Sequence, residues 1–118
     1  MAILPITITG EPVLHRVNKS IEVFDENLVR LVDDMFETMY EAPGVGLAAP
    51  QVGIDARLFV YAWEDEETGE EYKGVAVNPE LYITPTPIAK LKEEESEGCL
   101  SVPGYYFPTR RAEKAILR

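Results

Sequence analysis

The stretch Glu97-Gly98-Cys99-Leu100-Ser101 contains the most reactive side chain of the sequence, its only cysteine. Gly98 and Gly104 leave little side-chain cover around this thiol. A lone cysteine in a short chain is often a small buried hydrophobic residue. The alternatives are a metal-ligating thiolate or a nucleophile, and either one needs partners from elsewhere in the chain.

The sequence offers one histidine as a partner for Cys99, namely His15. A nucleophilic cysteine needs an adjacent base, but nothing in residues 12–17 indicates an active one. We therefore do not expect a cysteine–histidine dyad. We expect His15 to be a surface or half-buried side chain rather than a ligand.

Residues 44–53 form a second unusual stretch, with three glycines, two alanines and a proline. A backbone with so little side-chain bulk can approach a ligand closely, although a plain loop of small residues is the alternative. Residues 44–49 also match the dinucleotide pattern G-x-G-x-x-[GA], which is credible only between a strand and a helix. Here a predicted helix precedes the pattern and Pro50 opposes a following one, so a Rossmann site is excluded.

One amphipathic helix is predicted near the N-terminus, over residues 25–40. Asp25 is a suitable N-cap, and Pro43-Gly44 ends the helix. Its apolar positions recur at helical spacing, which predicts one core-facing stripe: Leu28, Leu31, Val32, Met35, Phe36, Met39 and Tyr40.

Short extended segments account for the rest of the predicted structure. Residues 57–63 are expected to form a buried strand, paired with residues 72–78 across an acidic turn. Further extended pieces are predicted at 3–9, 81–84, 88–92, 105–108 and 110–117. With one helix and no βαβ rhythm, the fold class is α+β with mainly antiparallel β-sheets.

Length and charge limit the other possibilities. A chain of 118 residues is expected to form a single domain, 1–118. The net charge of −10 argues against nucleic acid as a partner. The start lacks the basic region of a signal peptide, no apolar run is long enough for a membrane helix, and one cysteine cannot form an internal disulfide. These features predict a cytoplasmic protein with no membrane contact.

Two stretches together resemble a known family. Gly44-Val45-Gly46-Leu47-Ala48-Ala49-Pro50-Gln51 and Glu97-Gly98-Cys99-Leu100-Ser101 are similar to the first two signature motifs of the peptide deformylases. The resemblance covers essentially the whole chain and implies a peptide-deformylase-like fold. It also implies hydrolytic removal of the formyl group from the N-terminal methionine of new polypeptides, with Fe²⁺ as the metal and Zn²⁺ or Ni²⁺ as alternatives. The implied partners are N-formylmethionyl peptides, met at the ribosome.

The resemblance also implies roles around the cysteine. Cys99 matches the family's metal-ligating residue, and a coordinated thiol is deprotonated by the metal charge. Glu97 and Arg110 would brace the cysteine loop, with Arg111 as the alternative to Arg110.

A second group of implied roles concerns the substrate. Gln51 matches the side-chain amide that donates to the formyl oxygen, and Leu100 matches the position whose backbone N–H assists it. The two would form an oxyanion hole. Val45, Gly46 and Leu47 would bind the peptide, Val45 by lining the methionine pocket and the others through strand-like hydrogen bonds.

The family's third motif, a helix carrying His-Glu-x-x-His, has no counterpart in these 118 residues. That helix supplies two metal ligands and a general base, so we expect a fold that lacks its C-terminal catalytic helix and a chain that is inactive by itself. The sheet face left uncovered would favour self-association. Three interpretations remain open: a shortened deformylase, a non-catalytic relative that binds peptides or a partner chain, and an unrelated protein.

Overall fold

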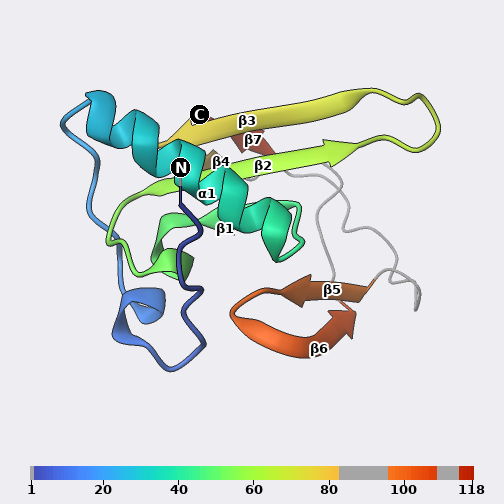
Figure 1. Ribbon diagram of the computed structural model, residues 1–118, viewed down its shortest axis with the longest axis horizontal. Helices are drawn as coiled ribbons and strands as arrows, with labels where there is room; N and C mark the ends of the chain where they lie inside the picture. Colours follow the sequence, from blue (N-terminus) through green and yellow to red (C-terminus); the bar gives the residue numbers. More distant parts are fainter. Residues whose placement is uncertain (1, 83–95, 109–114) are drawn as a thin grey trace.

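The computed structural model describes residues 2–82, 96–108 and 115–118 (Figure 1). Its elements follow in the order η1 (Pro12–His15), α1 (Glu26–Glu41), β1 (Gly46–Ala48), η2 (Ala49–Val52), β2 (Leu58–Glu64), β3 (Glu71–Val77), β4 (Leu81–Tyr82), β5 (Ser96–Cys99), β6 (Val102–Pro108) and β7 (Ile116–Leu117). This is the α+β architecture predicted from the sequence. Within the described ranges, no helix has the length and apolar character needed to cross a membrane.

The predicted amphipathic helix is confirmed as α1. The Asp25 carboxylate accepts the backbone N–H groups of Asn27 and Leu28 and so caps the helix. Met35 and Met39 are fully buried in the core beneath the helix. Tyr40 departs from the predicted stripe, because this last-turn side chain is 51% exposed.

The core lies between α1 and a three-stranded antiparallel sheet of order β1-β2-β3 (Figure 1). β2 and β3 pair along their full length, from Leu58–Val77 to Glu64–Glu71. Leu58 and Val60 point into the core, but Trp63 is 48% exposed because the hairpin runs on beyond the buried part of the sheet. The prediction of a wholly buried strand is therefore wrong for its second half.

Two further strand pairs complete the described structure. β5 and β6 form an antiparallel hairpin with a bulge between Gly98 and Cys99, and β4 pairs with β7. The strand predicted at 88–92 and most of that at 110–117 lie outside the described residues. The apolar side chains of β4 and β7 are exposed. The self-association expected from an uncovered sheet face stays a prediction.

The N-terminal segment, residues 2–8, begins beside α1 and has no regular secondary structure, and a turn follows it at residues 9–10. Leu4 packs against the core, and its N–H donates to the Thr38 hydroxyl at 2.8 Å. The Ala2 N–H donates to the Asp34 carboxylate at 2.7 Å. The helix α1 thus holds the start of the N-terminal segment, whose residues 7 and 9 bind the backbone of Gln51 and Ser101.

Candidate active-site cleft

The two glycine-bearing stretches meet at one cleft of about 780 Å³. One wall is the chain from Ala42 to Gly46 together with Gln51, and the other is the β5–β6 hairpin, residues 98–100 and 102–106. In Figure 1 this hairpin lies beside the C-terminal end of α1 and the start of β1. Residues 48 positions apart in the sequence, Gln51 and Cys99, therefore face the same space.

Gln51 lies in the short helix η2, directly after β1. Its Oε1 accepts the Ala48 N–H at 3.0 Å, and its Nε2 lies 3.7 Å from Cys99 Sγ. A backbone N–H can only pair with an acceptor, so the amide oxygen faces Ala48 and the NH₂ group faces the thiol. Cys99 is exposed, so the site is an accessible thiol with an amide donor beside it.

β1 leaves one edge open toward this cleft. The Ala62 N–H donates to the Val45 carbonyl at 2.9 Å, and Gly46 pairs with Tyr61. In an antiparallel ladder, alternate residues direct their peptide groups to the same edge. The N–H and C=O of Gly46 therefore point away from β2, where no other described strand pairs with β1.

Leu100 lies in the two-residue turn that joins β5 to β6. Its half-buried side chain packs on the core, and its Cδ1 would lie 3.0 Å from a Cβ added to Gly44. The absence of a side chain at Gly44 thus lets the cysteine turn sit against the end of α1. This contact joins the first glycine-bearing stretch to the second.

The other predicted site residues lie in different places: one in the cleft, one in the core and one in β5. Val45 lines the cleft and is 67% exposed. Leu47 is in the core, 2% exposed, and its peptide groups face β2, so its contact with the substrate stays a prediction. Glu97 lies in β5 opposite Phe107, while Arg110 and Arg111 fall outside the described residues.

Sequence reasoning missed the residues that tie the two loops together. The Ser101 hydroxyl accepts from Gln51 Nε2 at 3.2 Å, and its side chain is buried. The N–H groups of Thr7 and Thr9 donate to the carbonyls of Gln51 and Ser101 at 2.6 Å and 2.9 Å. Ser101 stood inside a recognised motif, but only the structure reveals that residues 7–9 bridge both loops.

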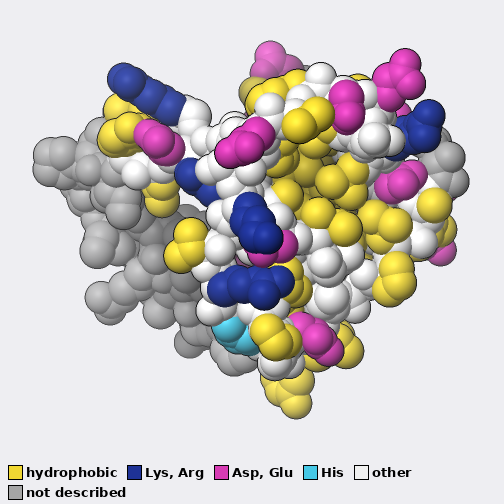
Figure 2. Space-filling view, turned by 90° about the vertical axis from the view of Figure 1, so that its left-hand side faces the viewer, with side chains coloured by type: hydrophobic (Ala, Val, Ile, Leu, Met, Phe, Trp, Pro, Cys, Tyr) yellow, Lys and Arg dark blue, Asp and Glu magenta, His cyan; other side chains and the backbone are white. Residues whose placement is uncertain are grey.

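The described residues do not provide a complete metal site. No group of three or more His, Cys, Asp or Glu side chains in residues 2–82, 96–108 and 115–118 could hold an ion. His15 is exposed at the end of η1, and its Nε2 accepts the Gly10 N–H at 3.1 Å. Figure 2 shows it, in cyan, next to basic side chains on the surface. Cys99 would supply a single ligand.

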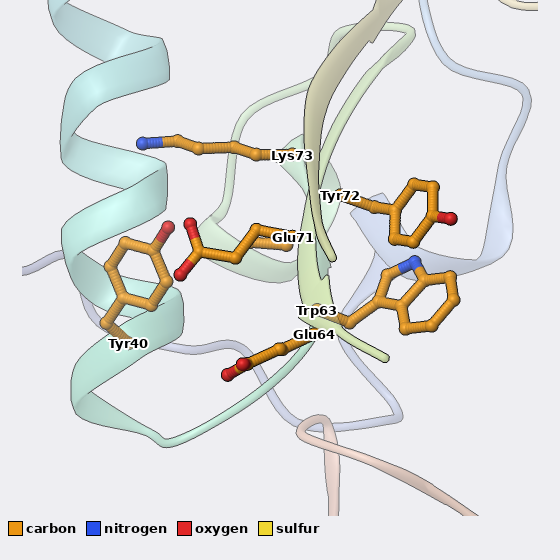
Figure 3. A pocket seen from close by; sticks show the side chains of 7 residues that line it. Tyr40, Trp63, Glu64, Glu71, Tyr72 and Lys73 are labelled. Carbon is orange, nitrogen blue, oxygen red and sulfur yellow. The ribbon is translucent and has the colours of Figure 1, made fainter. Parts of the chain in front are cut away.

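A smaller pocket of about 190 Å³ lies between α1 and the β2–β3 hairpin (Figure 3). Tyr40, Glu71 and Lys73 point into the space beside the helix, whereas Trp63 and Tyr72 point to the opposite side. These two rings stack with centroids 4.5 Å apart. None of the predicted site residues lines this pocket, so the candidate site is the larger cleft.

Comparisons with known proteins show the family to which the chain is similar. The family model described as "Polypeptide deformylase" matches residues 3–118. A peptide deformylase of Zymomonas mobilis is 50% identical over 113 residues, covering 94% of this chain and 62% of the relative. One of Rhodococcus opacus is 50% identical over 119 residues, with 98% and 61% covered. The chain thus spans about three-fifths of the length of these curated relatives.

Solved structures give the same result. The crystal structure of a peptide deformylase from Legionella pneumophila superposes with a TM-score of 0.81 at 43% identity, covering 98% of this chain and 64% of that one. A class I type b peptide deformylase from Acinetobacter baumannii gives a TM-score of 0.86 at 33% identity, with 99% and 75% covered.

Proposed function

The chain belongs to the polypeptide deformylase family, and we propose that it provides the peptide-binding cleft and oxyanion donors of a peptide deformylase. The reaction is hydrolytic removal of the N-formyl group from the N-terminal methionine of new polypeptides. The observation that carries this proposal is the Gln51 amide donor, 3.7 Å from the Cys99 thiol, in the cleft beside β1.

Peptide binding would occur at the open edge of β1. The outward N–H and C=O of Gly46 can pair with an extended peptide, which adds as a further strand. Gly46 has no side chain to keep that peptide at a distance, and Val45, exposed in the cleft, would contact the methionine side chain. The peptide would therefore lie along β1 with its formylated end near Gln51.

Gln51 and Leu100 would stabilise the charge that develops on the formyl oxygen. The Gln51 amide has its oxygen bound to the Ala48 N–H and its NH₂ group bound to the Ser101 hydroxyl, so the amide is oriented before the substrate arrives. The Leu100 N–H, in the turn next to Cys99, would be the second donor. Removing one such donor from an oxyanion hole lowers kcat by about 10²–10³-fold.

The family is metal-dependent, and we propose Cys99 as one thiolate ligand, for Fe²⁺ with Zn²⁺ or Ni²⁺ as alternatives. The described residues do not fit a three-ligand centre, so no chemical step is assigned to a metal here. We propose the cytoplasm as the location, because an exposed thiol stays reduced there. The same cleft without a complete ligand set favours a second candidate, a non-catalytic module that binds formylated peptides.

Two measurements on this chain test the proposal. The first is titration with a formyl-methionyl tripeptide and with the same tripeptide lacking the formyl group, followed by calorimetry. Preference for the formylated peptide is expected, and the variant Q51L should lose that preference while the core variant V60A keeps it. Equal binding of both peptides, or none, would contradict the proposal.

The second measurement is metal content by mass spectrometry on protein purified without oxygen. About one metal ion per chain, lost in C99S, would show that residues beyond the described ones complete the site. Formyl-peptide preference with no bound metal would favour the non-catalytic module. If the chain shows neither formyl-peptide binding nor bound metal, both candidate functions fail and only membership of the family's fold remains.

A further inference from the structure

We propose that Ser101 is a positioning residue for Gln51. Its buried hydroxyl fixes the rotation of the Gln51 amide so that the second N–H of that amide points at Cys99 Sγ and the cleft. The catalytic meaning of this role rests on the proposed function, but the positioning itself does not.

The geometry of the Gln51 amide gives each of its polar atoms a defined partner. Oε1 accepts the Ala48 N–H at 3.0 Å, and Nε2 lies 3.2 Å from Ser101 Oγ and 3.7 Å from Cys99 Sγ. An amide NH₂ carries two hydrogens. One of them goes to Ser101, and the other faces the thiol, which is a weak acceptor with longer contacts.

Ser101 is well placed to hold that orientation. It is 3% exposed, and its own carbonyl accepts the Thr9 N–H at 2.9 Å, so its backbone is anchored. A hydrogen bond in a buried, low-dielectric place is stronger than the same bond in water. The terminal torsion of glutamine is otherwise broad, and the single bond from Ala48 would leave the NH₂ group free to turn away from Cys99.

A purely structural role is less consistent with the contacts. Ser101 and Thr38 are the two buried polar side chains of the described residues. The Thr38 hydroxyl bonds only to backbone groups, at Leu4 and Asp34. The Ser101 hydroxyl instead contacts a side chain of the candidate site, so its loss should alter Gln51 before it alters the fold.

The test is an NMR comparison of the wild-type chain with S101A and T7V. In the wild type, a nuclear Overhauser effect is expected between the Gln51 side-chain amide hydrogens and the Cys99 β-hydrogens. S101A should reduce this effect at least about 2-fold and speed solvent exchange of the amide, since a lost hydrogen bond of ordinary strength corresponds to about 2- to 10-fold. T7V is the matched control, because it removes a hydroxyl that bonds to the Pro50 carbonyl of η2 at 2.9 Å rather than to the Gln51 side chain, and it should leave the effect unchanged.

An unchanged effect in S101A, or an equal loss in T7V, would overturn the proposal. If S101A does not fold, as judged by amide dispersion, S101C replaces it, because its thiol is similar in size but a weaker acceptor. A reduced effect in S101C supports the proposal and an unchanged one overturns it. No readout here involves a formylated peptide or a metal, so failure of the proposed function leaves this test intact.

Discussion

Replacing Thr38 with valine tests whether α1 holds the N-terminal segment that reaches the cleft. Thr38 is 1% exposed. Its hydroxyl accepts the Leu4 N–H at 2.8 Å and donates to the Asp34 carbonyl at 2.7 Å. Valine keeps the branched shape of the side chain and removes both hydrogen bonds.

The two lost bonds should have unequal effects. The Asp34 carbonyl still accepts the helical N–H of residue 38, so losing the hydrogen bond from the Thr38 hydroxyl matters little. The Leu4 N–H is left without a partner, and an unsatisfied buried donor costs about 1–3 kcal/mol. Leu4 is only half-buried, so we expect the free energy of unfolding to fall by about 1–2 kcal/mol.

Urea unfolding followed by circular dichroism measures this change, and T38S, which retains the hydroxyl, is the matched control. Amide hydrogen exchange supplies the second readout. Thr7 and Thr9, whose N–H groups bond to the two site loops, should exchange faster in T38V than in T38S. A loss below about 0.5 kcal/mol with unchanged exchange at both amides would refute the reasoning.

Three other changes should affect stability in ways the contacts predict. M39A removes a fully buried side chain of α1 and should lower the free energy of unfolding by about 2–5 kcal/mol. V29A, at a site 60% exposed on the same helix, should change it by less than about 0.5 kcal/mol. Equal urea midpoints for the two variants would contradict this expectation. D25A removes the N-cap of α1 and should cost about 0.5–2 kcal/mol, while D25S should recover most of the loss, and a D25S as unstable as D25A would argue against capping. The pKa of Asp55 is lowered from its ordinary value of 3.8, chiefly because the Asn18 side chain donates to its carboxylate. That stabilisation is present above the unfolded pKa and is lost as pH falls through the lower folded pKa. The free energy of unfolding, measured by urea titration at different pH, should therefore fall more steeply with acid in the wild type than in D55N. Parallel dependence on pH in the two proteins would exclude this carboxylate as a source of acid sensitivity.

The elements predicted correctly from the sequence are those whose signal is local. The helical spacing of its apolar residues and the Asp25 cap identify α1, and the β2–β3 hairpin follows from two apolar runs around an acidic turn. The stretch that contains β1 was predicted only as a segment of small residues that can approach a ligand, or as a plain loop, because three residues such as Gly46–Ala48 carry no detectable alternation. Its strand character comes from pairing with β2, which is a property of tertiary structure.

The site was predicted from sequence only in part. The motif resemblance identified Gln51 and Cys99, which the structure does bring together. It placed Leu47 at the substrate, whereas the register with Val60 turns that side chain into the core. A one-residue difference in position on a strand exchanges the two faces, and the motif alone does not specify which face a residue takes.

Several contacts that hold the β5–β6 hairpin against the rest of the chain are made by the two turn residues that follow the thiol. Leu100 packs on the core and against Gly44, and Ser101 bonds to Gln51 and Thr9. These interactions therefore contribute both to the attachment of the hairpin and to the position of Cys99. A change that loosens the turn must then move the thiol relative to Gln51 as well. The Trp63–Tyr72 end of the β2–β3 hairpin lies outside this cleft, so stability and site geometry can vary independently there but not at the cysteine turn.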